Sequence, residues 1–182
     1  MATKVSLRQF QQDLAQRLSS AKTEPVSLAR LGVQCGAAHW LIALEDAGEI
    51  VPVPEVLPVP LSKPWYLGVA NIRGSLFSVV DFSAFAGGAP TVRGAESRLL
   101  LAGSRFGINA ALLVSRMLGL KNARDLNAVP DDAQGAAGPL WAGRSWREGG
   151  PADAGGVSTA RVWRELKFEH LVESPDFLNV GA

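Results

Sequence analysis

The residues with the clearest potential for covalent chemistry are Cys35 and His39. Cys35 is the single cysteine of the 182-residue chain, and His39 is one of two histidines. Four residues apart on one inferred strand, they would lie on the same face, as a thiol–imidazole pair requires. The segment around them is apolar, however, and contains no residue that could orient the imidazole. We therefore expect a buried, unreactive cysteine and a partly exposed histidine.

The residue types give little support for a metal-binding or phosphate-binding site. With two histidines and one cysteine, a zinc site would need distant carboxylates, and no ligand spacing indicates one. Asp131 and Asp132 fit a solvated loop better than a metal site. The chain has neither a GxGxxG that opens a helix nor a GxxxxGK[ST] motif. We expect no metal, no cofactor and no enzymatic activity.

Nucleic acid is the other ligand class that the side chains suggest. Arginines and tryptophans gather toward the C-terminus and could stack on bases. These residues are Arg144, Arg147, Arg161, Arg164, Trp141, Trp146 and Trp163. Glu148 and Glu165 dilute their charge, and the net charge of +1 gives no general attraction to nucleic acid or to an anionic membrane. Packing of tryptophans across a β-hairpin explains the same residues more simply.

One cation and one anion stand inside an otherwise apolar segment, GVANIRGSLFSVVDF, at Arg73 and Asp81. Two β-type runs, 65–72 and 76–82, flank Arg73-Gly74-Ser75, which predicts a hairpin. Arg73 would then lie in the turn, where a long cation can reach a partner. Asp81 would end the second strand, where a structural role is favoured over a catalytic one.

The N-terminal residues 6–20 have the pattern of an amphipathic helix. Leu7, Phe10, Leu14 and Leu18 are spaced by three and four residues and form one apolar stripe. This stripe could pack on its own domain, or it could grip a partner or a second copy of the chain. No apolar run reaches the roughly 18–20 residues of a membrane-spanning helix, and the N-terminus lacks the apolar core of a signal peptide. A cytoplasmic protein without membrane insertion is the default expectation.

The middle of the chain is predicted to consist of short strands. Residues 33–44 indicate one buried strand, with a turn at Ala47-Gly48. An edge strand up to about Val53 follows, and then an extended link, because the prolines from position 52 to 60 cannot donate to a sheet. A second hairpin is expected at Gly103-Ser104-Arg105.

The end of the chain adds fewer elements. One strand is predicted within 139–146, a long hairpin tip at 148–156, a return strand within 157–166, and a helix with a further short turn over 168–178. Short strands joined by turns, without alternation of strands and helices, indicate an all-β barrel or sandwich.

The segment GVANIRGSLFSVVDF resembles the signature of the CheW-like domain family, a G-V-x-N-L-R-G run followed by a P-V-V-D-L-type strand. The resemblance spans about residues 31–173. It departs from the family pattern at Ser78, where proline is usual, at Phe82, where leucine is usual, and at Lys167, where aspartate is frequent. Within the family it is greatest to members that serve type IV pilus chemosensory systems, in the leading helix, in Trp65 before the signature, and in the ending WRELKFEHLVESPDFLNVGA.

The resemblance implies a mainly β fold of two small SH3-like five-stranded β-barrels packed together, with an N-terminal helix and a short C-terminal helix. It implies an N-terminal helix and linker at 1–30, a CheW-like domain of two intertwined barrels at 31–175, and a C-terminal tail at 176–182.

The resemblance also implies a non-catalytic adaptor. Such an adaptor couples the cytoplasmic tip of a methyl-accepting chemoreceptor to the regulatory domain of a CheA-like histidine kinase, here for twitching motility. It would be cytoplasmic and recruited to the inner face of the membrane at receptor arrays. The alternative is a free-standing SH3-like module that binds another protein or peptide outside chemosensory signalling.

Two sets of residues follow from the signature and from the expected strand faces. The residues expected to bind a partner are Arg73, Asn71, Val69, Leu112, Val114 and Glu49. The residues expected to shape the turn and the junction of the barrels are Gly68, Gly74 and Asp81.

Overall fold

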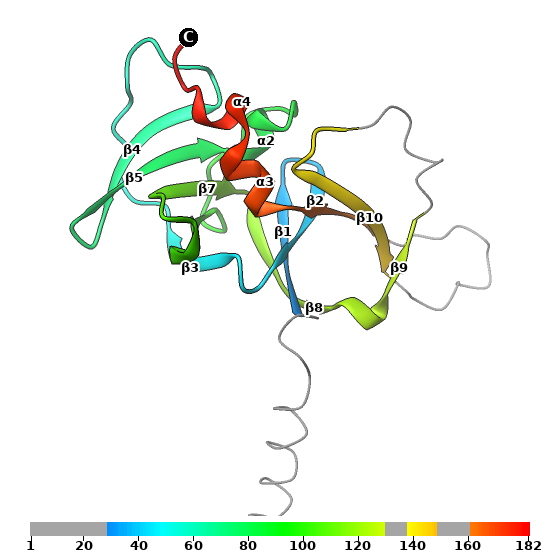
Figure 1. The fold of residues 1–182 in the computed structure, drawn as a ribbon. Coiled ribbons are helices and arrows are strands. Elements are labelled where there is room, and N and C mark those ends of the chain that lie inside the picture. The colour runs from blue at the N-terminus through cyan, green and yellow to red at the C-terminus, as the bar shows by residue number, and fades with distance from the viewer. Residues whose placement is uncertain (1–28, 130–137, 149–160) are drawn as a thin grey trace, which may run out of the picture.

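A computed structural model describes residues 29–129, 138–148 and 161–182 (Figure 1). The predicted N-terminal helix, Asp131 and Asp132, and almost all of the predicted hairpin tip lie outside these residues. In the described parts, most of the regular structure is β. The strands are β1 Ala29–Cys35, β2 Ala38–Ala43, β3 Ala47–Pro52, β4 Tyr66–Ile72, β5 Ser75–Asp81, β6 Arg98–Ala102, β7 Ala110–Val114, β8 Arg116–Asn122, β9 Leu126–Ala128, β10 Ala142–Glu148 and β11 Val162–Leu166. The helical elements are short: α2 Phe82–Phe85, α3 Phe168–Glu173 and α4 Pro175–Leu178, with the 3₁₀ turns η2 Ser104–Phe106 and η3 Ala123–Asp125.

The strands form two curled sheets that lie side by side (Figure 1). The first sheet has six strands in the order β8-β1-β2-β11-β10-β9, and the second has five in the order β3-β6-β7-β5-β4. The chain begins in the first sheet, builds the whole of the second, and returns to the first. The predicted pair of β units packed together is therefore confirmed, although one of them has six strands rather than five.

The prediction of one buried strand over residues 33–44 is wrong, because β1 and β2 form a hairpin there. Cys35 pairs with Ala38 across a turn at Gly36-Ala37, and Gly36 has a φ of 58°. This left-handed conformation suits glycine, which has no Cβ to clash. Apolar residues on both sides of the turn concealed it in the sequence.

The two predicted hairpins are present. The β4–β5 turn has two central residues, Arg73 and Gly74, with φ values of 51° and 86°. Two successive positive φ angles define a type I′ turn, which matches the twist of an antiparallel pair. β6 and β7 form the second hairpin, and β3 lies at an edge of its sheet as the prolines indicate.

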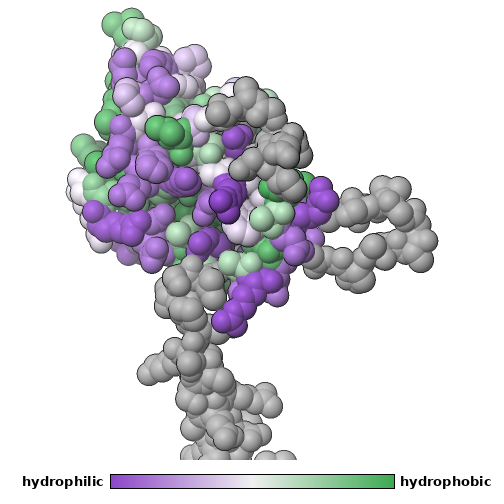
Figure 2. All heavy atoms as spheres, turned by 45° about the vertical axis from the view of Figure 1, so that its right-hand side comes forward, coloured by the Kyte–Doolittle hydropathy of each residue, from purple (hydrophilic) through white to green (hydrophobic). Residues whose placement is uncertain are grey.

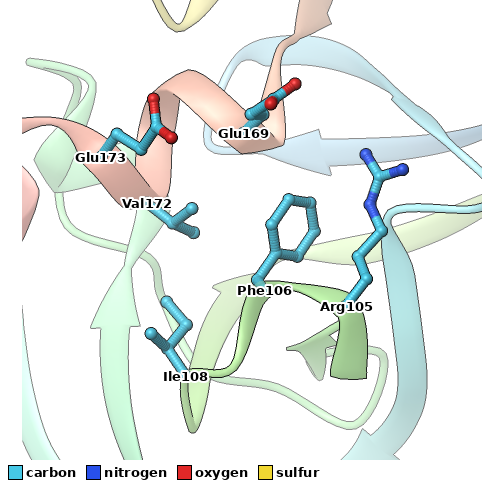
Figure 3. A pocket seen from close by; sticks show the side chains of 6 residues that line it. All are labelled: Arg105, Phe106, Ile108, Glu169, Val172 and Glu173. Atoms are coloured by element: carbon cyan, nitrogen blue, oxygen red, sulfur yellow. The ribbon is translucent and has the colours of Figure 1, made fainter.

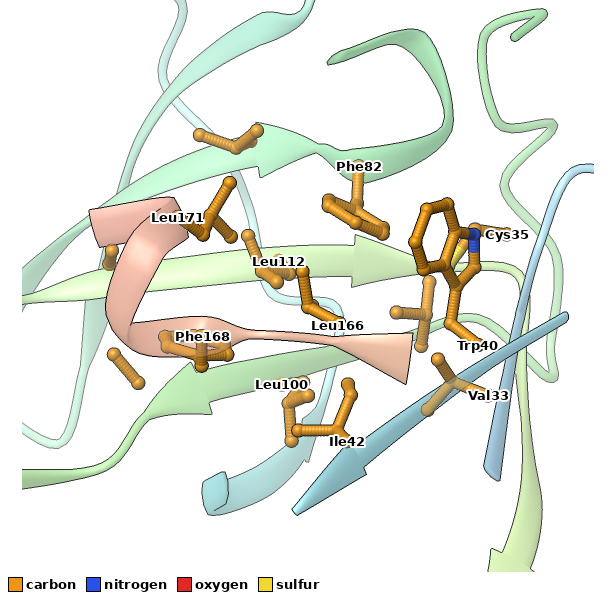
Figure 4. Packing of buried hydrophobic residues seen from close by; sticks show 14 of the residues in the cluster. Val33, Cys35, Trp40, Ile42, Phe82, Leu100, Leu112, Leu166, Phe168 and Leu171 are labelled. Atoms are coloured by element: carbon orange, nitrogen blue, oxygen red, sulfur yellow. The ribbon is translucent and has the colours of Figure 1, made fainter. Parts of the chain in front are cut away.

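The buried side chains form one shared core between the sheets and one smaller cluster on the opposite face of each sheet. The shared core contains Trp40 and Ile42 from the first sheet, Leu100 and Leu112 from the second, and Phe168 and Leu171 from α3 (Figure 4). The second sheet's own cluster includes Leu99 and Leu113, and the first sheet's own cluster includes Leu41 and Trp163. Strands at the junction are consequently buried on both faces.

The C-terminal helices close one end of the junction (Figure 1). Phe177 of α4 is 5% exposed and joins the shared core, stacking against Trp65 with a centroid distance of 6.5 Å. The last residues also pair with the β3–β4 link, since Lys63 N donates to Val180 O at 2.9 Å. The described end of the chain is thus attached to the second sheet.

Candidate partner-binding surface

The turn of the signature hairpin displays Arg73 to solvent, with 76% of its side chain exposed. Its Nη2 atom lies 2.5 Å from Oε1 of Glu49, on β3. β3 and β4 are at opposite edges of the second sheet. An ion pair between these edges can form only because the sheet curls nearly closed, so the fold itself brings together two residues that the sequence places 24 positions apart.

Asn71 and Gly74 build the turn that presents Arg73. The side-chain Oδ1 of Asn71 accepts a hydrogen bond from Gly74 N at 2.8 Å. Asn71 is exposed, so this bond fixes the turn without requiring burial of the amide. It leaves the amide nitrogen of Asn71 on the surface beside Arg73, where a partner could use it.

The extended link that precedes the hairpin hydrogen-bonds to Val69 and packs against Gly68. Leu57 N donates to Val69 O at 2.8 Å, and Val69 N donates to Leu57 O at 2.9 Å. A Cβ on Gly68 would lie 1.9 Å from the carbonyl oxygen of Leu57, and the φ of Gly68 is 124°. Glycine is needed here because the link pairs so closely with β4 that a Cβ would overlap the Leu57 backbone.

Asp81 is 2% exposed and ties three segments together where β5 ends. Its carboxylate accepts hydrogen bonds from Ser83 N and Ala84 N, which caps α2, and from both the N–H and the hydroxyl of Thr91. The Thr91 bonds measure 2.6 and 2.7 Å. All four donors belong to the backbone or to a neutral side chain, so Asp81 has the surroundings of a structural residue rather than of a reactive acid.

One face of the β4–β5 hairpin contributes to the shared core near α2. Toward the turn, the same face is exposed to solvent. Val69 pairs with Ser78 and Asn71 with Leu76, while Val80, two residues beyond Ser78, lies in the core. Leu76 is 62% exposed and Val69 is half-buried. We call this set the hairpin face: Val69, Asn71, Arg73, Leu76 and Glu49.

Leu112 and Val114 must be removed from the expected contact residues. Both are 0% exposed in the shared core. The expectation rested on one solvated face per strand, but every residue of β7 is buried. Ala111 and Leu113 fill the second sheet's own cluster, and the alternate residues fill the junction, so β7 has no outer face.

A pocket of about 430 Å³ lies between α3 and the loop that connects β6 to β7 (Figure 3). We call it the α3 pocket, and its lining residues are Arg105, Phe106, Ile108, Glu169, Val172 and Glu173. Sequence reasoning missed it, because its walls come from segments about 60 residues apart and no motif marks them. Arg105 forms an ion pair with Asp46, and that cation opposes the upward shift that burial gives the pKa of Asp46.

Cys35 and His39 do not form a catalytic pair. They lie on different strands, and the register pairs His39 with Gln34 instead. Burial raises the pKa of the Cys35 thiol, with Asp81 adding to the shift, so the reactive thiolate is disfavoured. Burial, Arg161 and Arg116 lower the pKa of His39. The prediction of a buried cysteine is confirmed. The strand topology, as well as the apolar surroundings, keeps Cys35 and His39 from acting as a pair.

The remaining chemistry-bearing residues have structural surroundings. Trp146 and Trp163 are paired in register on β10 and β11, as a packed hairpin predicts. In residues 29–129, 138–148 and 161–182, no three His, Cys, Asp or Glu side chains form a group able to hold a metal ion. Within the same ranges, no helix is both long and apolar enough to span a membrane.

Comparison with known proteins decides the family. The CheW-like domain matches residues 30–138, which is more than half of the chain. The chain belongs to the CheW-like domain family. Proteins of this family are scaffolds and adaptors rather than enzymes.

The chain is also similar to a named bacterial protein and to a solved structure. It is 26% identical over 109 residues to Protein PilI of Pseudomonas aeruginosa, an alignment that covers 60% of this chain and 61% of the relative. The crystal structure of the scaffolding protein TtCheW from Thermoanaerobacter tengcongensis superposes with a TM-score of 0.58 at 13% identity, covering 78% of this chain and 89% of the other. The second likeness concerns the fold alone.

Proposed function

We propose that this protein is an adaptor that couples a methyl-accepting chemoreceptor to a CheA-like histidine kinase in a system that controls type IV pili. Family membership supports the adaptor role, and the similarity to PilI, together with the pilus-type sequence features, supports the pilus system. It would act in the cytoplasm at receptor arrays, without inserting into the membrane.

The observation that carries the proposal is the hairpin face. It combines the exposed Leu76 and the half-buried Val69 with a solvent-exposed charged pair, Arg73 and Glu49, at its rim. Apolar surface inside a charged rim is the usual composition of a protein–protein interface. The pair is worth little to folding, since exposed ion pairs contribute about 0–1 kcal/mol. Its rigid display on a type I′ turn therefore serves recognition.

The two partners would use different parts of this surface. A chemoreceptor tip is a helical hairpin, and its apolar side chains could lie along Val69 and Leu76. The regulatory domain of the kinase has a related barrel fold, and it could meet the barrel end at Glu49 and the Arg73 turn. Such a division would let one adaptor hold both partners at once.

The test is binding of the full chain to a purified kinase regulatory domain and to a receptor tip, with the Arg73→Glu variant beside the wild type. The reversed charge would face Glu49 and the partner, so we expect affinity for at least one partner to fall by about 10- to 100-fold. Arg144→Glu is the matched control, since Arg144 is also exposed but lies on β10 in the other sheet.

Three results would contradict the proposal in different ways. Unchanged binding of Arg73→Glu to both partners removes the hairpin face as the interface. Unfolding of that variant, judged by circular dichroism, makes Arg73 a structural residue. Failure of the wild type to bind either partner favours the alternative, a free-standing SH3-like module for another protein or peptide.

A further inference from the structure

The α3 pocket has an apolar floor and a charged rim, and no described segment fills it (Figure 3). Phe106, Ile108 and Val172 form the floor and are only partly buried. Glu169 and Glu173 stand on the α3 side of the rim, and neither forms an ion pair with a described residue. Such a pocket fits an apolar side chain on a segment that also carries basic residues.

The N-terminal segment of this same chain has that composition. Its predicted helix over 6–20 has one apolar stripe, Leu7, Phe10, Leu14 and Leu18. At 100° per residue, Arg17 borders the stripe on one side. Residues 1–28 contain four basic and two acidic residues, a net charge of +2. The segment therefore complements both the floor and the acidic rim.

A series of contacts links the first described residue to the wall of the pocket. Leu44 N donates to the carbonyl oxygen of Ala29, the first described residue, at 3.3 Å. Two residues further on, Asp46 forms an ion pair with Arg105 and accepts a hydrogen bond from Gly103 N. Arg105 lines the pocket. The eight residues 21–28 can span roughly 26 Å when extended, enough to carry the helix back to that wall.

We propose that the apolar stripe of residues 6–20 docks in the α3 pocket of the same molecule. Phe10 and Leu14, in the middle of the stripe, would pack on Ile108 and Val172 beside Phe106, whose ring already contacts Phe168 and Arg105, while Arg17 would face Glu169 and Glu173. The proposal concerns the chain alone and does not depend on a receptor or a kinase.

Amide hydrogen exchange on the full chain tests this docking directly. The variant Leu14→Glu places a charge in the stripe, and Gln16→Glu places the same charge on the opposite face of the helix. Both new residues favour helix about as well as the old ones. We expect exchange in 103–109 and 168–173 to accelerate at least about tenfold in Leu14→Glu, the effect of losing a buried leucine contact. Gln16→Glu should match the wild type.

A second variant changes the pocket instead of the N-terminal segment. Glu169→Lys combined with Glu173→Lys reverses the rim charge at two exposed positions, which should leave the core intact. Exchange in residues 6–20 should then rise toward the rate of the free segment. The measurement is repeated across a hundredfold range of protein concentration, because docking within one molecule is independent of concentration.

Three outcomes would overturn the proposal. Equal exchange in Leu14→Glu, Gln16→Glu and the wild type would show that the stripe does not cover the pocket. Protection that grows with concentration would assign the pocket to the stripe of a second copy. Protection of 103–109 and 168–173 that appears only when a receptor tip is added would assign it to that partner.

Discussion

Arg73, like Leu61, is a non-glycine residue with a positive φ. Its φ of 51° lies in the left-handed region, which costs a side chain with a Cβ roughly 1–2 kcal/mol. Asparagine or glycine would occupy this turn position more easily. The long cation is nevertheless displayed there, with Asn71 holding the turn. Strain at an exposed position without core contacts supports a role in recognition.

Gly68 and Gly74 should respond very differently to the same substitution. Both have positive φ values, 124° and 86°, but only Gly68 faces a backbone: its Cβ would meet the Leu57 carbonyl oxygen at 1.9 Å, whereas Gly74 has nothing within 4 Å. Gly74→Ala should lower the free energy of unfolding by about 1 kcal/mol, the cost of the backbone conformation. Gly68→Ala should cost about 3 kcal/mol or more, because the link must also move.

Urea unfolding of the two variants measures the difference. Similar losses for both would mean that the link between β3 and β4 moves away easily, and that its pairing with β4 contributes little to stability.

His39 should make the protein less stable as the pH falls. Burial, Arg161 and Arg116 hold its pKa in the folded protein below the usual value of about 6.5. The folded chain then binds fewer protons than the unfolded chain, so the stability it contributes is complete above about pH 6.5 and declines below it.

The replacement His39→Gln isolates this effect from other titrating groups such as Asp46. Between about pH 7.5 and pH 5.5, on either side of the usual histidine pKa, the urea midpoint of the wild type should fall further than that of the variant. Parallel changes in the two proteins would show that His39 titrates alike in the folded and unfolded states.

At the scale of elements, β7 explains why some residues could be predicted from the sequence and others could not. The hairpin at Arg73-Gly74 and the edge strand β3 were predictable, because turn geometry and proline chemistry act locally. The burial of Leu112 could not be predicted, because the pattern of apolar residues does not distinguish a strand covered on one face from a strand covered on both faces. That depends on which elements pack on the second face of β7, here β1 and α2, in a core that α3 also joins.

The same limit applies to the candidate surface. Arg73, Asn71 and Gly68 could be singled out from one signature segment. Glu49 could be suggested, but its ion pair with Arg73 depends on the curl of the sheet. Leu76 and the α3 pocket were missed, since exposure of an apolar residue carries no local signal.

Truncation of β7 should be costly on both of its faces. Leu112→Ala opens a cavity in the shared core, and Leu113→Ala opens one in the second sheet's own cluster. Each leucine is 0% exposed, so each change should lower the free energy of unfolding by about 2–5 kcal/mol. Leu76→Ala, on the exposed side of the adjacent strand β5, should cost less than about 1 kcal/mol and serves as the control.

Thermal and urea unfolding of these three variants provide the comparison. A small loss for Leu112→Ala, combined with weaker partner binding, would restore Leu112 as a contact residue. It would show that the junction opens in solution to expose β7.

At the scale of the whole molecule, the shared core makes the two sheets one folding unit. Its buried side chains come from strands of both sheets and from α2, α3 and α4, and the chain passes between the sheets twice. Neither sheet could separate without exposing residues such as Trp40, Leu112 and Phe168. We therefore expect a single cooperative transition rather than one for each sheet.

Tryptophan fluorescence can test this in a Trp65→Phe background, because Trp40, Trp146 and Trp163 lie on strands of the first sheet, whereas Trp65 precedes β4 of the second. Leu113→Ala weakens only the second sheet's own cluster. If the sheets unfold together, tryptophan emission and far-ultraviolet circular dichroism should shift to the same lower urea midpoint in this variant. An emission midpoint that stays at the value of the Trp65→Phe background while the dichroism shifts would show that the sheets unfold separately. An adaptor that must hold a fixed geometry between two partners requires the first result, since a hinge between its halves would uncouple them.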